Sequence, residues 1–182
     1  MIDAKVIIVG NSYVGKTSLV HRYVHQEHAS NLGQTIGAAF YSVKEKINNN
    51  EVRYFIWDTA GEEKFRSIGK MYYRGSKGCL CIFNVTDRKS FDDLEYWINT
   101  VKESAPDNIK ILLLATKTDL DKKLWTVTIE EIEKLSKKIG LEYYLTSAVT
   151  GENVNKCFKI LGEHCLKITE NNDAYFKLQE IP

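Results

Sequence analysis

Residues 10–18, GNSYVGKTS, combine two glycines with a lysine and a threonine at the spacing G-x-x-x-x-G-K-[ST]. Glycine lets the main chain wrap closely around an anion, so that successive N–H groups donate to it, and Lys16 adds a positive charge for the β and γ phosphates. The hydroxyl of Thr17 is suited to Mg²⁺. An apolar run before the segment and a helical pattern after it distinguish this motif from an ordinary glycine turn. The segment therefore predicts a nucleoside triphosphate site.

A second group of polar residues follows two later apolar runs and predicts which base is bound. Lys117 and Asp119, in the stretch ATKTDL, come directly after the run ILLL, and TSA at 146–148 follows the last run. A carboxylate accepts from both N1–H and the exocyclic N2–H of guanine, a pair of donors that adenine does not offer. Guanine is therefore predicted. A phosphate-loop kinase or ATPase is the weaker alternative, because it conflicts with Asp119 and with DTAG at 58–61.

The hydrophobic pattern predicts the elements that must position these residues. Apolar runs alternate with longer helical patterns, which favours a parallel sheet, and the turn 48–50 joins 40–47 to the next run as a hairpin. Thr128 and Glu131 have the spacing of a capping box, and Gly140 marks the end of their helix. We expect a doubly wound α/β fold with a mostly parallel six-stranded sheet, one antiparallel edge strand and helices on both faces. The other strands are predicted at 5–9, 52–57, 79–85, 110–115 and 141–145, and the helices at 16–25, 90–103, 129–139 and 153–168.

Size and composition fit one globular domain. The 182 residues are 43% hydrophobic, and we expect a domain at 1–170 followed by a flexible or truncated tail at 171–182. Lys and Arg number 25 against 24 Asp and Glu, so no nucleic-acid partner is expected. The apolar stretches are shorter than the roughly 18 residues of a membrane span. Four cysteines, none in a Cys-x-x-Cys pair, are predicted to be buried and reduced, as in a cytoplasmic protein.

Together with DTAG, these motifs resemble those of the Ras superfamily of small GTPases, in the same order and over nearly the whole chain. Three segments sharpen the resemblance to the Rab branch: TIGAAF at 35–40, FIWDTAGEEKFRSI at 55–68 and MYYRGSKG at 71–78. The resemblance implies a switch in vesicle and membrane traffic that binds GTP and GDP with Mg²⁺ and hydrolyses GTP. It also implies effectors, an exchange factor and a GTPase-activating protein that bind the switch regions.

The resemblance also implies roles for individual residues. Thr35 would meet Mg²⁺ and the γ-phosphate, Asp58 would hold the metal through water, and the Gly61 amide would sense the γ-phosphate. Lys117 would brace the phosphate loop and the base, and the Ala148 amide would contact O6. The expected metal-binding residues are Thr17, Thr35 and Asp58, and the expected catalytic residues are Lys16, Thr35, Gly61 and Glu62. The expected nucleotide-binding residues are Ser12, Tyr13, Val14, Gly15, Lys16, Thr17, Ser18, His28, Thr35, Gly61, Thr116, Lys117, Asp119, Leu120, Ser147, Ala148 and Val149. The expected effector-binding residues are Phe40, Trp57 and Tyr72, with plain core aromatics as the alternative.

Glu62 departs from the family pattern DTAGQE, in which a glutamine orients the attacking water. Glutamine accepts from water and donates toward the γ-phosphate, whereas an ionised glutamate only accepts and adds negative charge beside an anion. We therefore expect slow hydrolysis, and the alternative is a scaffold or regulator that holds GTP without appreciable turnover. An acid/base pair with Glu63 is disfavoured, because phosphoryl transfer depends on positioning and electrostatics more than on proton relay.

Three further departures concern the nucleotide pocket. Thr116 stands where most of the superfamily has asparagine, although the Rho branch also has TKxD, so guanine binding is expected to survive. His28 offers less area for packing on the base than the usual aromatic ring, and Tyr13 adds a bulky ring to the phosphate loop.

The way in which the protein reaches membranes stays open. The chain has no terminal cysteine for prenylation, which is consistent either with a trimmed chain or with a protein that does not anchor in this way. A monomer is expected, in the cytoplasm and as a peripheral protein on endomembranes.

Overall fold

The computed structural model describes residues 1–29, 32–33, 35–61 and 71–179, with the side chains of these residues up to 170. Its centre is a six-stranded sheet in the order β2-β3-β1-β4-β5-β6. β2 pairs antiparallel with β3 and the other pairs are parallel, which confirms the predicted sheet. The strands are β1 (Ile2–Val9), β2 (Ala38–Ile47), β3 (Asn50–Thr59), β4 (Gly78–Asn84), β5 (Lys110–Thr116) and β6 (Tyr143–Leu145). The helices are α1 (Lys16–His25), α3 (Arg88–Asp92), α4 (Leu94–Ser104), the 3₁₀ helix η2 (Lys122–Leu124), α5 (Ile129–Ile139) and α6 (Val154–Gln179).

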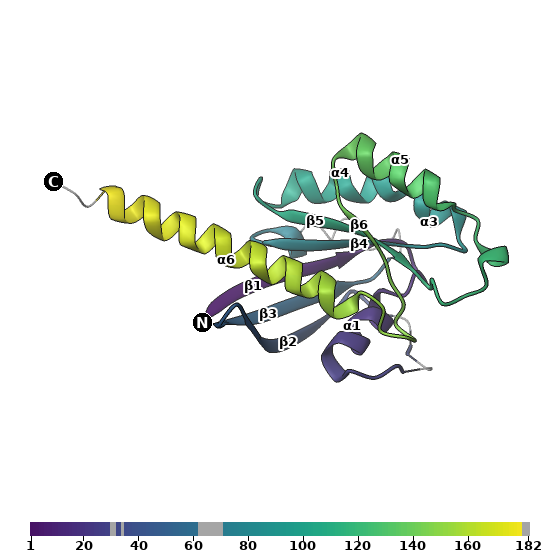
Figure 1. Ribbon diagram of the computed structural model, residues 1–182, viewed down its shortest axis with the longest axis horizontal. Helices are drawn as coiled ribbons and strands as arrows, with labels where there is room; N and C mark the ends of the chain where they lie inside the picture. The colour runs from purple at the N-terminus through teal and green to yellow at the C-terminus, as the bar shows by residue number, and fades with distance from the viewer. Residues whose placement is uncertain (30–31, 34, 62–70, 180–182) are drawn as a thin grey trace.

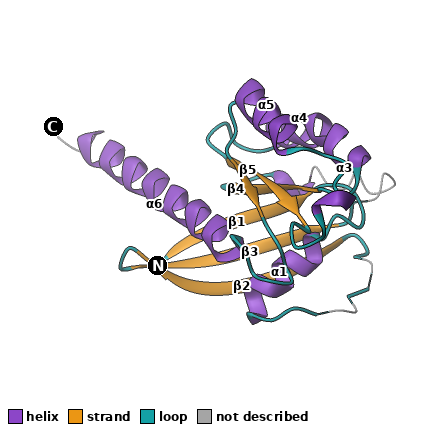
Figure 2. Cartoon of the chain, turned by 45° about the vertical axis from the view of Figure 1, so that its right-hand side comes forward, coloured by secondary structure: helices purple, strands orange, loops and turns teal. Residues whose placement is uncertain are grey.

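Alternate residues of the strands face two layers of helices. In β1, Val6 and Ile8 pack in one core with α1 and α6, whereas Ile7 and Val9 pack in a second core with α3, α4 and α5. Figures 1 and 2 show the two layers on opposite faces of the sheet. The four cysteines are free and buried in these cores, as predicted.

Local sequence signals account for two boundaries of the fold. Asn48 and Asn49 have φ of 48° and 64° and form the two-residue connection between β2 and β3, which are paired from Ile47 opposite Asn50 onward. Thr128 and Glu131 form the predicted capping box at the start of α5, and Gly140 ends that helix with φ of 69°.

Two helices differ from the predicted bounds. The helix expected at 90–103 is divided into α3 and α4, because Asp87 caps the first short helix and the chain begins a new helix after Asp93. α6 continues to Gln179 instead of ending near residue 168, and Figure 1 shows it extending past the edge of the sheet. Its second half contains neither glycine nor proline, so nothing local ends the helix at that point.

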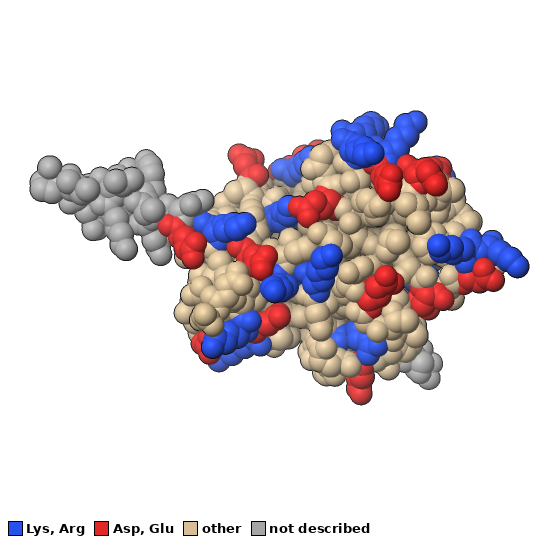
Figure 3. Space-filling model, viewed as in Figure 1, with Lys and Arg blue, Asp and Glu red and all other residues tan. Residues whose placement is uncertain are grey.

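Among the described residues, no helix is both long and apolar enough to cross a bilayer. Figure 3 shows basic and acidic side chains interspersed over the described part of one face. This mixture agrees with the near-zero net charge of the chain.

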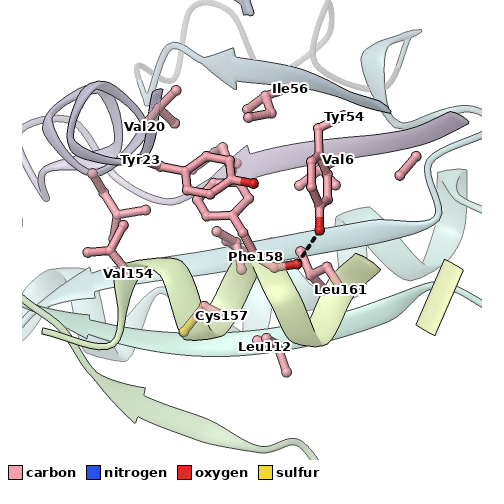
Figure 4. Packing of buried hydrophobic residues seen from close by; sticks show 14 of the residues in the cluster. Val6, Val20, Tyr23, Tyr54, Ile56, Leu112, Val154, Cys157, Phe158 and Leu161 are labelled. Carbon is pink, nitrogen blue, oxygen red and sulfur yellow. Dashed lines mark hydrogen bonds between the residues drawn. The ribbon is translucent and has the colours of Figure 1, made fainter. Parts of the chain in front are cut away.

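Tyr54 is fully buried in the core between the sheet and α6 (Figure 4). Its ring meets Phe158 edge-on at 6.0 Å between centroids, and Tyr23 of α1 stacks on Phe158 at 3.7 Å. The Tyr54 hydroxyl donates to the Phe158 carbonyl oxygen at 2.7 Å, which satisfies its buried polar group. Gly162 lies against this hydroxyl, because a Cβ at Gly162 would be 2.2 Å from Tyr54 Oη and 2.3 Å from Ile47 Cδ1.

Gly162→Ala is expected to lower the free energy of unfolding by about 1–3 kcal/mol, because the added methyl group must displace Tyr54. At an exposed position in a helix the same substitution would instead raise the free energy of unfolding, by roughly 1 kcal/mol. Lys167→Ala, at an exposed position of α6, is the control and should change stability by less than about 0.5 kcal/mol. Urea denaturation followed by circular dichroism measures both changes. A Gly162→Ala chain as stable as the parent would contradict the tight contact.

Candidate functional site

The polar segments identified in the sequence meet at one edge of the sheet. The loop 10–15 follows β1, segment 117–120 follows β5 and segment 146–149 follows β6, so all three leave the carboxyl ends of parallel strands. β1 lies between β3 and β4, where the strand order changes direction. In doubly wound sheets this point forms the crevice in which ligands bind.

The loop after β1 has a backbone suited to an anion. Gly10 and Gly15 have φ of 143° and 99°, and a Cβ at Gly10 would lie 2.1 Å from the carbonyl oxygen of Ile82. α1 begins directly after Gly15, so the first N–H groups of the helix face the loop without a side-chain cap from Gly15. The loop borders a cavity of about 190 Å³, and Tyr13, with φ of 62°, leaves its ring largely exposed beside it.

Lys16 places a buried ammonium at the base of this loop. Its Nζ donates to the carbonyl oxygens of Gly10 at 2.9 Å and Asn11 at 2.7 Å. Burial lowers the pKa of Lys16 to about 8, and the attraction of the Asp58 carboxylate opposes that shift. An ammonium has three donors, so a third can serve a phosphate oxygen.

Asp58 lies at the end of β3 and faces the start of α1. Its Oδ2 accepts from Thr17 Oγ1 at 2.6 Å and from Thr35 Oγ1 at 3.5 Å, and the two hydroxyls are 2.8 Å apart. Burial raises the pKa of Asp58, while the Thr17 hydrogen bond and the Lys16 charge oppose the shift. Asp58 Oδ1 is buried and has no hydrogen-bond partner among the described residues. A carboxylate with an unpaired oxygen beside two hydroxyls is a donor set that fits a hard cation such as Mg²⁺.

A second cavity, also of about 190 Å³, lies between the loops after β5 and β6. Asp119 lines it, and Asp119 Oδ1 accepts from Ser147 Oγ at 2.6 Å, which fixes the orientation of the carboxylate. Lys117 crosses to the phosphate loop, where its Nζ donates to the Tyr13 carbonyl oxygen at 3.0 Å. Gly15, Ser18 and Lys117 line both cavities, so the two are neighbouring parts of one groove.

The structure brings most of the predicted site residues to this groove. Val14, Asp58 and Ser147 line neither cavity. Val14 is buried beneath the loop, Asp58 is buried behind Thr17, from which it accepts, and Ser147 supports Asp119. Glu62 and Glu63 lie outside the described residues. The first cavity is lined by the predicted residues Ser12, Tyr13, Gly15, Lys16, Thr17, Ser18, Thr35, Gly61 and Lys117. The second is lined by Gly15, Ser18, His28, Thr116, Lys117, Asp119, Leu120, Ala148 and Val149.

Two supporting residues were not predicted from the sequence. The Asn11 side chain donates to Asp93 Oδ2 at 2.7 Å and accepts from Trp97 Nε1 at 2.7 Å, which ties the phosphate loop to α4. Arg22 of α1 donates to the carbonyl oxygen of Val149 at 2.5 Å, beside the second cavity. Their partners are 82, 86 and 127 residues away in the chain, so no local pattern points to these contacts.

Comparison with known proteins agrees with the motifs and the fold. A model of the Ras family matches residues 5–167. The chain is a Ras-family small GTPase. It is 43% identical over 172 residues to a probable Rab-related GTPase of Acanthamoeba polyphaga mimivirus, and the matched region covers 93% of this chain and 80% of the relative. It is 37% identical over 168 residues to the Ras-related protein Rab-2B of Dictyostelium discoideum, covering 92% and 83%. It is 36% identical over 159 residues to the Ras-related protein SEC4 of Saccharomyces cerevisiae, covering 87% and 73%.

In this Rab-related GTPase the three predicted effector residues form a row at the surface. The rings of Phe40 and Trp57 are 5.2 Å apart between centroids, and those of Trp57 and Tyr72 are 5.1 Å apart. Phe40 is 51% exposed, and the other two are partly exposed. Trp57 and Tyr72 also pack against the second core, so an effector-binding role for the three aromatics stays a prediction.

Lys16 is expected to make anion binding by this GTPase depend on pH. Its folded-state pKa of about 8 lies below the ordinary 10.5, so the ammonium is charged below that pH and loses its charge as the pH rises through it. The nucleotide-free chain should bind inorganic pyrophosphate progressively more weakly above pH about 8, by up to about tenfold per pH unit. Calorimetric titration at several pH values measures this. Lys16→Met corrects for the ionisation of pyrophosphate itself, and an inflection that persists in this variant would assign it to another group.

Proposed function

We propose that this protein is a Rab-type switch that binds GTP and GDP with Mg²⁺, hydrolyses GTP slowly and acts in vesicle traffic. The observation that supports it most directly is the position of Asp119. This carboxylate is held by Ser147 on the wall of one cavity, and the neighbouring cavity is bordered by a phosphate loop. One groove therefore combines a group for a base with groups for a phosphate chain.

The base is guanine in this proposal. With Asp119 Oδ1 accepting from Ser147, the carboxylate still has lone pairs that can accept from N1–H and N2–H of guanine. The backbone N–H of Ala148, which also lines this cavity, is suited to donate to O6. Adenine has an acceptor at N1 and a donor at position 6, so both contacts would be lost. This is also the argument against a kinase or ATPase that uses ATP.

The phosphates lie along the loop 10–15 in this proposal. Lys16 supplies the buried positive charge, and the N-terminal N–H groups of α1 supply neutral donors. Thr17, Thr35 and Asp58 would hold Mg²⁺, directly or through water, in an oxygen-rich site that includes phosphate oxygens. The bound metal would neutralise charge between the β and γ phosphates.

The switch rests on two segments that contact the phosphate loop. The Thr35 hydroxyl lies 2.8 Å from that of Thr17, beside the proposed metal site. Gly61 packs on the loop backbone, where an added Cβ would be only 2.3 Å from the carbonyl carbon of Asn11. Both positions would respond to the presence of a γ-phosphate. Effectors, an exchange factor and a GTPase-activating protein would therefore bind these segments and the aromatic row beside them.

Slow turnover is proposed on the chemistry of Glu62. An ionised glutamate lacks the N–H that a glutamine offers to the transition state, and its charge opposes that of the γ-phosphate. A scaffold or regulator that holds GTP with almost no turnover is the second candidate, and the same residue favours it. We propose a cytoplasmic monomer with peripheral attachment to endomembranes, in keeping with the Rab names of the relatives.

Asp119→Asn is expected to weaken GDP binding and to favour xanthosine diphosphate, because the amide offers a donor to the changed edge of xanthine. The parent chain should bind labelled GDP and show little binding of labelled ADP. Asp121→Asn removes the same charge two residues away, where the carboxylate accepts from the Lys123 N–H, and should bind GDP like the parent. Fluorescence titration of the three proteins measures these affinities. Comparable affinities of the parent for GDP and ADP would contradict the guanine site.

Glu62→Gln is expected to raise the rate of GTP hydrolysis, since it restores a donor and removes a negative charge. The parent should be slow even beside the reference rates of about 10⁻⁴ to 10⁻³ per second for this class without an activating protein. Glu63→Gln removes the same charge at the adjacent position and should change the rate little. Single-turnover hydrolysis of bound GTP measures all three. If both variants hydrolyse GTP at the parent rate, Glu62 does not limit turnover and the slow-switch proposal loses its basis.

A further inference from the structure

Thr116 lines the second cavity, the proposed site of the base. It is the last residue of β5, it lines the cavity beside Asp119, and it is only 4% exposed. Its Oγ1 lies 2.5 Å from the carbonyl oxygen of Val14 in the phosphate loop and 2.9 Å from that of Phe83 in β4. The hydroxyl therefore ties the phosphate loop to the sheet.

The number of protons on this hydroxyl limits what it can do for a base. A threonine hydroxyl has one donor, and both of its close partners are carbonyl oxygens, which only accept. Whichever carbonyl it serves, the proton is used by the main chain, and Thr116 has only lone pairs to offer a ligand. Guanine has acceptors at N7 and O6, so neither atom can receive a hydrogen bond from Thr116.

Asp119, which lines the same cavity, supplies the other kind of group, an acceptor for the donors of a base. The Asp119 carboxylate is oriented by Ser147 toward donors such as N1–H and N2–H, which lie on the Watson–Crick edge. Of these two side chains, Asp119 supplies an acceptor for N1–H and N2–H of guanine, whereas Thr116 supplies no donor for N7. Asparagine, the usual residue of the superfamily at this position, has two amide N–H donors and could serve a carbonyl oxygen and a base acceptor at once.

We propose that Thr116 makes this site indifferent to position 7 of the purine, so that guanine nucleotides without N7 bind as tightly as GDP. The inference rests on the proposed guanine site and deepens it, because it names the class of altered bases that the site accepts. Other side chains that line the cavity also carry donors, namely Ser18, His28 and Lys117, and the Lys117 Nζ donates to the Tyr13 carbonyl oxygen at 3.0 Å. In this proposal none of them serves N7.

The test compares GDP with 7-deaza-GDP, which has a C–H in place of N7 and the same Watson–Crick edge. Each displaces a fluorescent GDP analogue from the 182-residue chain, and the ratio of the two dissociation constants is measured. The expected ratio is within about twofold of one. A loss of about tenfold for 7-deaza-GDP would show that a donor such as Lys117 serves N7, and it would overturn the proposal.

Two variants locate the effect at Thr116. Thr116→Asn introduces a second N–H and should bind GDP about three- to tenfold more tightly than 7-deaza-GDP, the value of one hydrogen bond. Thr116→Val removes the hydroxyl and should release GDP faster, because the Val14 and Phe83 carbonyls lose their donor, but its ratio should stay near one. A parent ratio above one that falls to one in Thr116→Val would contradict the proton count.

The comparison within each protein separates the outcomes. The two dissociation constants in each ratio are measured on the same protein, so a general loss of stability cancels. If Thr116→Asn does not fold, the ratio of the parent chain alone decides the proposal. If the parent binds ADP as well as GDP, the proposed function fails and this inference with it. Tight, guanine-specific binding of GDP together with rejection of 7-deaza-GDP would overturn this inference alone.

Discussion

The buried ammonium of Lys16 and the buried carboxylate of Asp58 are the charges around which the groove is organised. Burial of either charge is unfavourable, which is why the pKa of Lys16 falls and that of Asp58 rises. Two loop carbonyls and the Thr17 hydroxyl compensate only part of this cost, and one oxygen of Asp58 has no partner among the described residues. A phosphate chain with a divalent cation would complete both environments. The binding site is thus prepared by charges that the protein alone leaves incompletely satisfied.

The phosphate loop can present its N–H groups only if its own backbone is held in place. Several parts of the fold do so from different directions. Gly10 packs directly on the β4 carbonyl of Ile82, and Thr116 of β5 bonds to the Val14 carbonyl oxygen. Lys117 bonds to the Tyr13 carbonyl oxygen, and the Asn11 side chain is held by α4. The loop is preorganised, so binding an anion requires little further ordering.

The proposed metal-binding residue and the predicted effector-binding row are adjacent on one strand. Asp58 and Trp57 are consecutive in β3, so their side chains point to opposite faces, and Trp57 pairs in register with Phe40 of β2. The Ala60 N–H donates to the Gly37 carbonyl oxygen at 2.8 Å and joins the ends of these two strands. A change at the phosphate side therefore has a short, hydrogen-bonded route to the exposed aromatic row. In the proposed switch, this connection would let partners detect the nucleotide state.

The sequence by itself determined the features that depend on neighbouring residues. The phosphate loop, the Asn48-Asn49 connection and the capping box of Thr128 each arise from backbone preferences over a few residues, and all were predictable. Alternating apolar runs likewise predicted the sheet and both of its helical layers. Tertiary structure alone decided that the Thr116 proton is used by the carbonyls at positions 14 and 83, and that Ser147 orients Asp119. These partners are 102, 33 and 28 residues apart, and they meet only because parallel strands bring their carboxyl ends to one edge of the sheet.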